Sequence, residues 1–524
     1  MGNSSFDVIV VGAGHNGLTA AATLAGKGKT VCVIERNATV GGMAQNTTLA
    51  EGVKAPEIAH LLYNLHPQVA KELGIGSPKA PLETKELATV SLAPDGQHVE
   101  IVGSRARYAD GRPHPEAETF AALHDRLSKF ASLLGQMSTK SPPALDGGLA
   151  SLATMGDLAG LAKLGLDLKR LGKKDMREFL RVLLSNVYDL ILDDLDDTPL
   201  AGALAADAVR GAYAGPRSPG TVFTLMYRLG NGGNIDLPIG GMGAVAAAFA
   251  SAARHRGVDI RTGTGVKRVL VDNDQVTGVE LDDGTVITAR AVLSNASPKP
   301  SMMLAGPEHF DVEATRRIRH MRCKGTTAKV NLVLSAAPVF PGLNAEQTAG
   351  RLLISPGATY AERAFNPAKY GEMPKEPLIE AVIPSLSDPG IAPNGQHVLS
   401  AIVSFIPRDL KDGWDEAARE RLASLAVQTL EKYAPGLGAL VVAKQVLSPA
   451  DIEDLTGVPG GHWHHAEMGI DQILTVRPVN QMAHYRFGPK GYFLCGAGAH
   501  PGGDIMGAAG RNAALQLLKD GVLK

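Results

Sequence analysis

The stretch DVIVVGAGHNGLTAAATLAGKGKTVCVIER, residues 7–36, decides the fold of this chain. Two short β-branched runs flank a glycine cluster and a run of good helix formers, which predicts a strand, a tight turn, a helix and a second strand. Gly12 permits the turn, Gly14 lets the backbone approach a pyrophosphate, and Gly17 allows the helix to pack closely on the strand. This order of elements is the fingerprint of a Rossmann-like dinucleotide site.

The groups around these glycines predict how a dinucleotide is held. Ala13, His15 and Asn16 lie at the start of the helix, where free N–H groups and the helix dipole favour an anion. Glu35 ends the second strand about 20 residues after the fingerprint, where an acid hydrogen-bonds a ribose hydroxyl. Arg36 follows it directly. This motif by itself does not separate NAD from FAD.

Two further segments favour FAD. Residues 36–44, RNATVGGMA, place a second glycine pair beside an extended cofactor, through Gly41, Gly42, Met43 and Ala44. A predicted strand over 491–495 precedes a run of small residues and a helix that ends near Lys519. Small residues let a flat ring lie against backbone, and the helix start stabilises negative charge on a reduced flavin. The predicted contacts in this segment are Gly496, Ala497, Met506, Gly507 and Ala508.

Composition limits the remaining possibilities. A chain of 524 residues with 44% hydrophobic content exceeds the size of a single core, so two or more domains are expected. Lys and Arg number 52 against 53 Asp and Glu, which argues against a nucleic-acid partner. The three cysteines form no C-x-x-C pair, which indicates a reducing compartment, and the first residues show no secretion signal. We therefore expect a cytoplasmic protein.

The motifs VVGAGHNGL, ERNATVGGMA, LPIGGMGAVAAAFASAARHRGVDIRTGTGVKRV and GYFLCGAGAHPGGDIMGAAGRNAA resemble those of the phytoene desaturase-related FAD oxidoreductases. The resemblance is strongest to the branch that includes pyridine nucleotide-disulfide oxidoreductase domain-containing protein 2. It implies an α/β architecture, with a Rossmann-like FAD-binding domain of the glutathione reductase/amine oxidase type and a discontinuous α+β substrate domain. The implied FAD-binding domain comprises residues 1–64, 236–300 and 461–524, and the substrate domain comprises 65–235 and 301–460.

The resemblance also places residues from the middle of the chain at the cofactor. Val266 is expected to contact the adenine through its backbone, and Asn295 and Ala296 are expected near the diphosphate. The hydropathy pattern agrees with a layout that returns to the first domain. It predicts a turn and buried helix over 237–253 rather than a membrane span, and strands over 258–261, 266–271, 276–281 and 286–289.

The substrate domain shows two kinds of pattern. Residues 149–195 repeat apolar side chains at helical spacing, with basic clusters at Lys169-Arg170 and Lys173-Lys174. This pattern predicts core-facing helices of a cap, and the alternative is a surface helix that makes peripheral membrane contact. The second part predicts a sheet with helices on one side, as the floor of a pocket, with strands over 327–334, 378–384 and 397–405 and a helix over 415–433.

The segment HWHHAE, residues 462–467, is the most prominent cluster of chemistry-bearing side chains. Adjacent histidines on an extended segment point to opposite faces, so we predict no metal site. By resemblance, His465, Glu467, Asp471 and Gln472 fall on a shared pattern, and they either line the active site or anchor its loop. We take His465 and Glu467 as catalytic candidates. His462 and His464 do not match the pattern and are expected in a solvated loop.

Four more residues are candidates by position. His500 is expected beside the flavin ring, either to orient substrate or move a proton, or as a structural histidine. Asp504 stands where the family usually has glycine, and it is either an acid/base or a helix N-cap. Arg217 and Arg477 either bind an anionic substrate group or form surface salt bridges.

Together these features predict an FAD-dependent oxidoreductase of the desaturase or dehydrogenase type. It would remove a hydride and a proton from a hydrophobic, isoprenoid or carotenoid-like substrate and pass electrons to oxygen or a quinone. The alternatives are a flavin-dependent isomerase, an amine oxidase-like enzyme, and a non-catalytic prenyl-lipid carrier of the same fold. The carrier is disfavoured because the cofactor glycines are all present. A homo-oligomer remains open.

Overall fold

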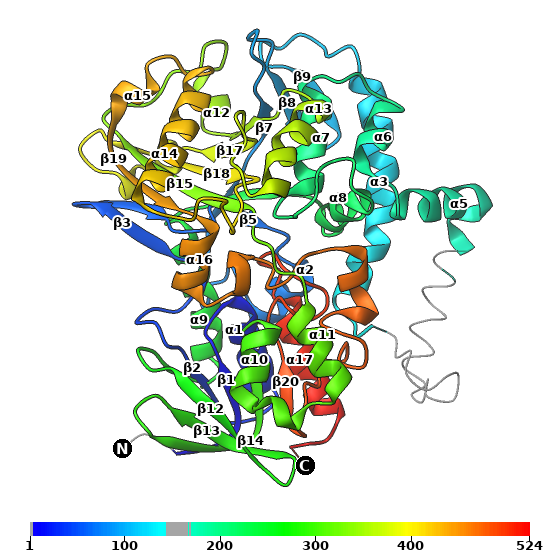
Figure 1. Cartoon of the computed structure of the whole chain (residues 1–524), viewed down its shortest axis with the longest axis vertical. Helices are drawn as coiled ribbons and strands as arrows, with labels where there is room; N and C mark the ends of the chain where they lie inside the picture. The colour runs from blue at the N-terminus through cyan, green and yellow to red at the C-terminus, as the bar shows by residue number, and fades with distance from the viewer. Residues whose placement is uncertain (1–3, 143–165, 167–168, 524) are drawn as a thin grey trace.

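The computed structural model describes residues 4–142, 166 and 169–523. Figure 1 shows two lobes, of which the lower carries both described ends of the chain and the upper carries a second sheet. The chain crosses between the lobes several times, as a discontinuous arrangement requires.

The sheet of the lower lobe has seven strands among the described residues, and its order is β11-β2-β1-β14-β13-β12, with β20 also paired to β14. β11, β2, β1, β14 and β20 run parallel, while β13 and β12 add an antiparallel ribbon. The two opening strands match the predicted ones. The bounds are β1 (Ser5–Val11), β2 (Val31–Ile34), β11 (Asp259–Arg261), β12 (Val266–Asp272), β13 (Gln275–Leu281), β14 (Val286–Ser294) and β20 (Tyr492–Leu494).

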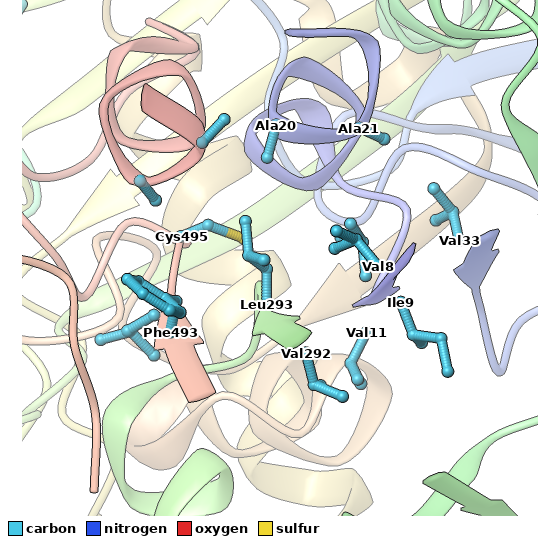
Figure 2. Packing of buried hydrophobic residues seen from close by; sticks show 14 of the residues in the cluster. Val8, Ile9, Val11, Ala20, Ala21, Val33, Val292, Leu293, Phe493 and Cys495 are labelled. Atoms are coloured by element: carbon cyan, nitrogen blue, oxygen red, sulfur yellow. The ribbon is translucent and has the colours of Figure 1, made fainter. Parts of the chain in front are cut away.

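Helices α1 (His15–Ala25), α9 (Met242–Arg254) and α17 (Ala508–Lys519) cover this sheet. Figure 2 shows the reason: Ala20 and Ala21 of α1 face Val8 and Leu293, so the small side chains let the helix approach the strands closely. The parallel strands are buried on both faces, which explains their continuous apolar runs. The predicted turn and buried helix over 237–253 are confirmed as the end of β10 (Ile235–Pro238) followed by α9.

The upper lobe contains an eight-stranded sheet within the described residues, in the order β19-β15-β18-β17-β16-β7-β8-β9, and its pairing is antiparallel except between β16 and β7. The strand predicted over 327–334 is confirmed at both ends. The bounds are β7 (Thr89–Ser91), β8 (Val99–Val102), β9 (Arg105–Tyr108), β15 (Thr327–Leu334), β16 (Arg351–Ile354), β17 (Ile379–Val382), β18 (His397–Ser404) and β19 (Val441–Leu447).

Helices cover both faces of this upper sheet, so the expectation of helices on one side was wrong. Leu422 of α14 packs with Leu352 on one face, while Ala361 of α13 packs with Leu353 on the other. Consecutive residues of a strand point to opposite faces, so each face has its own cover. The helices are α3 (Ala117–Ser138), α6 (Val187–Leu192), α7 (Pro199–Val209), α8 (Thr221–Leu229), α12 (Ala345–Thr348), α13 (Ala358–Phe365), α14 (Glu416–Glu431), α15 (Leu437–Leu440) and α16 (Pro449–Thr456).

Two small sheets join the lobes. The strand β10 pairs with β5 (Leu62–Tyr63) and β6 (Thr84–Glu86), and β3 (Asn46–Ala50) pairs with β4 (Val53–Pro56). The core of the lower lobe also takes in α2 (Pro67–Leu73), α10 (Pro298–Ala305) and α11 (Val312–His320). Its packing therefore extends beyond the predicted boundaries at residues 65 and 301.

Part of the predicted amphipathic segment, residues 149–165, lies outside the described residues. The described part contains α5 (Gly172–Leu183), which projects from the upper lobe in Figure 1 and exposes Leu180. Contact between this helix and lipid stays a prediction. Among the described helices, none is both long enough and apolar enough to cross a bilayer.

Candidate flavin and substrate site

A cavity of about 750 Å³ lies between the two lobes, within the range of about 300–1,000 Å³ that ligand sites occupy. Val11 and Ile34 reach it from the carboxyl ends of β1 and β2, and Asn295 reaches it just after β14. Ligands of open parallel sheets bind outside these strand ends. Tyr63 and Arg210 close the cavity from the side of the upper sheet.

The structure brings most of the predicted cofactor residues to this one cavity, although they come from distant parts of the chain. Those that line it are Gly12, Gly14, His15, Asn16, Glu35, Arg36, Gly41, Gly42, Met43, Ala44, Val266, Asn295, Ala296 and Ala497. The predicted residues that do not line it are Ala13, Gly17, Gly496, Met506, Gly507 and Ala508.

Several of the predicted cofactor residues that do not line the cavity still shape its walls. A Cβ on Gly17 would lie 2.2 Å from the carbonyl oxygen of Gly12, so this glycine sets the distance between helix and turn. A Cβ on Gly496 would lie 2.5 Å from the carbonyl oxygen of Asn295. Met506 and Gly507 lead into α17, which packs on α1 rather than facing the cavity.

Asn295 covers the glycine turn. Its side chain would lie 2.7 Å from a Cβ on Gly14, so that position needs glycine to accept it, while Gly12 is needed for its φ of 95°. The main-chain N–H of Gly41 donates to the carbonyl of Ala13 at 2.9 Å, which fixes the second glycine pair beside the first. The result is a backbone-lined cradle, as a dinucleotide needs.

Glu35 organises one end of this cradle. Its Oε2 accepts from the main-chain N–H of Ala13 at 2.8 Å, and its Oε1 accepts from that of Asn37 at 2.9 Å. Each carboxylate oxygen has two acceptor positions, so both can also accept from a ribose hydroxyl. Glu35 therefore joins the turn, the second strand and the ligand position.

Unpaired polar atoms support the fit of a polar ligand. Among the described residues, His15 Nε2, Asn16 Oδ1 and Ser297 Oγ are buried without a hydrogen-bond partner, and all three residues line the cavity. Such groups are costly unless a ligand or water satisfies them. Backbone N–H groups at the start of α1, the glycine cradle and these three atoms together fit the diphosphate and ring of FAD.

Of the four catalytic candidates, His465 and Asp504 line the cavity. Both have left-handed backbone, with φ of 62° and 61°, as does the neighbouring Asn64 at 56°. Non-glycine residues rarely adopt such values, and they concentrate at functional sites. Glycine adopts such left-handed backbone most readily, so Asp504 holds a strained conformation. Its Oδ2 accepts from Asn64 Nδ2 at 2.8 Å.

The other two candidates do not reach the cavity. Glu467 accepts from the guanidinium of Arg322 at 3.0 Å, and Asp471 and Gln472 bind the same arginine residue. These three residues of the shared pattern therefore anchor the loop. His500 donates from Nε2 to the carbonyl of Met137 at 3.1 Å and is buried away from the cavity. That environment agrees with the structural alternative.

Three expectations for this region were wrong. His462 and His464 are buried, at 1% and 6% exposure, instead of lying in a solvated loop, and His464 lines the cavity. Arg477 is fully buried and makes no surface salt bridge. Its guanidinium donates to carbonyl oxygens of His464, Glu467, Gln472 and Ala497, so it ties the histidine loop to the cofactor segment. Within the described chain, no three His, Cys, Asp or Glu residues are grouped to hold a metal.

Sequence reasoning missed the wall of the cavity that faces the upper lobe. Arg210 contacts two aromatic rings, with its Cζ 3.9 Å from the centroid of Tyr63 and 5.0 Å from that of Trp463. A Cβ on Gly211 would lie 1.9 Å from Trp463 Nε1, so the glycine makes room for the indole. The adjacent Arg210 and Gly211 were the one local sequence feature that could have indicated this wall.

A buried ionic network lies behind this wall. Arg351 donates from Nε to Glu380 at 2.7 Å and from Nη2 to Asp207 at 2.6 Å. Tyr63 Oη and His60 Nε2 also bind Glu380, at 2.9 and 3.0 Å. Burial alone would raise the pKa of Glu380, but the charges of Arg351 and Arg210 hold it well below its usual value. The carboxylate therefore stays charged and fixes Tyr63 in place.

The family model for flavin-containing amine oxidoreductases matches residues 17–518 of this sequence. The chain belongs to this family. As a member of the flavin-containing amine oxidoreductases it is an FAD-dependent oxidoreductase. The predicted FAD cofactor and the Rossmann-like fold are thereby confirmed.

Relatives in this flavin family span nearly the whole chain. Pyridine nucleotide-disulfide oxidoreductase domain-containing protein 2 of Rattus norvegicus is 32% identical over 98% of this chain and 94% of its own. Phytoene desaturase (neurosporene-forming) of Cereibacter sphaeroides is 24% identical over 96% and 92%. Among solved structures, putrescine oxidase bound to putrescine is 15% identical with a TM-score of 0.60, and each chain is fully covered. That likeness shows the shared fold.

Proposed function

We propose that this flavoenzyme is a dehydrogenase of the desaturase type that takes a hydride and a neighbouring proton from a hydrophobic substrate. The observation that carries the proposal is a single cavity shared by the cofactor cradle and an apolar wall from the upper lobe. That wall includes Ile58, Leu61 and Tyr63. The name of the bacterial phytoene desaturase supports a substrate of this kind.

When bound, the flavin supplies the hydride acceptor. The chain supplies charge control: burial lowers the pKa of His465 to about 3 and that of His15 to about 4, so both imidazoles are neutral near pH 7. They can orient groups by hydrogen bonds without adding charge. Asp504 presents a carboxylate to the cavity from left-handed backbone, so we assign its Oδ1 the uptake of the substrate proton.

An amine oxidase-like reaction is the second candidate, because the fold is shared with putrescine oxidase. An aromatic pair can hold a cationic amine by cation–π contacts. Here the guanidinium of Arg210 already contacts Tyr63 and Trp463. A protonated amine would therefore meet a positive charge at that place, which favours the desaturase-type reaction.

The proposal is tested by anaerobic mixing of the flavin-loaded enzyme with hydrophobic isoprenoids, alcohols and amines while the visible flavin absorbance is followed. Bleaching by a hydrophobic C–H donor, with a new double bond in the product, is the expected result. Bleaching by amines alone would contradict it. Product formation without net bleaching, with reduced enzyme, would instead indicate a flavin-dependent isomerase.

Variants locate the proton acceptor. Asp504→Asn should slow flavin reduction by at least about tenfold, within the range of about 10²–10⁴ that general acid–base groups supply, and should retain bound flavin. Asp412→Asn, at an exposed loop position, is the matched control. Full reduction rates in Asp504→Asn would remove this residue from the mechanism.

A further inference from the structure

Arg210 is far less hydrogen-bonded than a buried arginine normally is. Its guanidinium carries five N–H donors, yet its single hydrogen bond among the described residues is a long one of 3.4 Å from Nη1 to Asp504. Its Nε is buried without a hydrogen-bond partner, and its ion pair with Glu380 is a long one of 3.6 Å. An incompletely bonded charge in a buried place costs stability unless something else satisfies it.

Arg351, a few ångströms deeper in the same network, shows what a satisfied arginine looks like. It donates to Glu380 at 2.7 Å, to Asp207 at 2.6 Å and to Thr89 at 3.2 Å, and its side chain is 2% exposed. Glu380 is occupied by Arg351, His60 and Tyr63, so it has little capacity left for Arg210. The local carboxylates therefore serve Arg351 first and leave Arg210 short of acceptors.

The free part of Arg210 faces the cavity. The residue lines the cavity, its side chain is 17% exposed, and Nη2 is not among the atoms closed off from the surface. Nη2 has no hydrogen-bond partner among the described residues, while Nη1 has the long bond to Asp504. The rings of Tyr63 and Trp463 lie 3.9 and 5.0 Å from the guanidinium Cζ, so two aromatic contacts restrict its movement.

Building on the proposed dehydrogenase function, we propose that Arg210 anchors a carboxylate at the head of the hydrophobic substrate. A carboxylate accepts two parallel N–H bonds from Nη1 and Nη2, and this planar pairing is what a guanidinium fork recognises. The two aromatic rings keep the fork preorganised, so little side-chain entropy is lost on binding. The substrate class is an apolar chain that ends in a carboxylate.

The charge of the wall agrees with this ligand. Three arginines, Arg210, Arg228 and Arg351, lie near three carboxylates, Asp207, Glu380 and Asp504. Arg228 and Arg351 both pair with Asp207, and Arg351 also pairs with Glu380, so two of the three carboxylates are occupied. Asp504 is shared between Asn64 and Arg210. An incoming carboxylate supplies the missing acceptor, whereas an ammonium head carries only donors and has no acceptor for the guanidinium of Arg210.

The test compares three probes with the same alkyl chain, decanoate, decanol and decylamine, bound to the flavin-loaded enzyme and followed by calorimetry at neutral pH. Decanoate should bind at least about tenfold more tightly than decanol, which is 1.4 kcal/mol, and decylamine should bind most weakly. Equal affinity of decanoate and decylamine would overturn the proposal, and this comparison needs no variant.

Variants then assign the contact to Arg210. Arg210→Gln should weaken decanoate at least about tenfold and leave decanol unchanged, and Arg210→Lys should weaken decanoate less, because it keeps the charge and loses the fork. Arg217→Gln is the matched control, because Arg217 stacks on Tyr188 at 4.1 Å but does not line the cavity. Unchanged decanoate affinity in folded, flavin-loaded Arg210→Gln would overturn the assignment.

The two proposals fail in different ways. Absence of a preference for decanoate, together with flavin bleaching by neutral hydrophobic substrates, would remove the carboxylate anchor and keep the dehydrogenase. Tight decanoate binding that depends on Arg210, together with no flavin reduction by any C–H donor, would keep the anchor and remove the dehydrogenase.

Discussion

The two walls of the cavity are built on opposite principles. The cofactor wall is made of backbone and small residues: a Cβ on Gly14 would come within 2.7 Å of Asn295 Nδ2, so the fit depends on missing side chains. The opposite wall combines apolar side chains such as Ile58 and Leu61 with long charged and aromatic ones, and the Cζ of Arg210 lies 3.9 Å from the ring centroid of Tyr63 and 5.0 Å from that of Trp463. We expect the first wall to hold the cofactor and the second to meet the substrate.

The difference between the two walls separates the residues expected to bind the cofactor from those expected to select the substrate. A backbone cradle recognises a phosphate and a ring that every flavoenzyme of this kind shares, so its residues occur in compact motifs. The opposite wall depends on an ionic network in which Glu380 from β17 meets Arg351 from β16 and His60 from near β5. Its partners are separated by up to about 320 residues along the chain, so no local motif records them.

The largest expected effect follows from neutralising Glu380, the carboxylate at the centre of the buried ionic network. Glu380→Gln removes one of the two carboxylates that pair with Arg351 at 2.6 Å, and loss of one partner of a buried pair costs about 3–5 kcal/mol. We expect that loss in the free energy of unfolding, measured by chemical denaturation. Glu376→Gln, which breaks the exposed pair with Lys432, should cost no more than about 1 kcal/mol. Equal effects would show that the network does not stabilise the wall.

The cofactor wall is tested at Glu35. Glu35→Ala removes two charge-assisted hydrogen bonds from Ala13 and Asn37, and we expect FAD binding to weaken by about 1.5–3 kcal/mol. Retained flavin after gel filtration and the dissociation constant measure the effect. Glu51→Ala, at an exposed turn, is the control. Unchanged flavin content in Glu35→Ala would contradict its assignment to the ribose.

The close approach of α1 to the glycine turn gives a third test. Gly17→Ala places a methyl group 2.2 Å from the carbonyl oxygen of Gly12, so helix or turn must shift. Overpacking of this kind costs about 1–3 kcal/mol and should lower both the melting temperature and flavin content. Gly390→Ala meets its nearest atom at 3.4 Å and should leave both unchanged. A normal flavin content in Gly17→Ala would show that the cradle tolerates rearrangement.

The smallest expected effect concerns how the free energy of unfolding depends on pH through His500. Burial lowers the pKa of His500 to about 4, so the folded state holds it neutral while the unfolded state titrates near 6.5. The stability that the folded protein gains from keeping His500 neutral is complete above pH 6.5 and is lost as the pH falls toward 4. Between pH 7.5 and 5.5 this costs about 1.4 kcal/mol of stability.

His500→Gln should therefore show a smaller loss of unfolding free energy over that pH interval, by about 1.4 kcal/mol. His255→Gln, at an exposed position after α9, should keep the slope of the natural protein. Parallel pH profiles for His500→Gln and the natural protein would show that His500 titrates alike in both states.

Much of the fold could be predicted because local patterns record burial. The strand over 327–334 was placed at both ends, because six of its eight residues, TAKVNLVL, are apolar or β-branched. The strand over 286–289 was placed too short, since β14 continues to Ser294 through AVLS. That segment was expected to return to the cofactor, and Asn295 does line the cavity.

Two of the four predicted catalytic residues line the cavity and two do not. His465 and Asp504 reach the cavity from loops next to glycine turns, while Glu467 and His500, only a few residues away, hydrogen-bond Arg322 and Met137 instead. Which of several polar neighbours faces a cavity depends on backbone direction, and the left-handed φ of His465 and Asp504 sets it. Sequence spacing carries no record of that choice.

By itself the sequence determined that the chain binds a dinucleotide in a Rossmann-like lobe and that segments from both ends of the chain meet at one cavity. The glycine turn, the flanking strands and Glu35 are close in sequence, so their spacing alone sets their geometry. Only the tertiary structure decided that His464 and Arg477 are buried and that Arg210 lines the cavity. A charged side chain can be buried only when partners from distant segments satisfy it, and those partners exist only once the chain has folded.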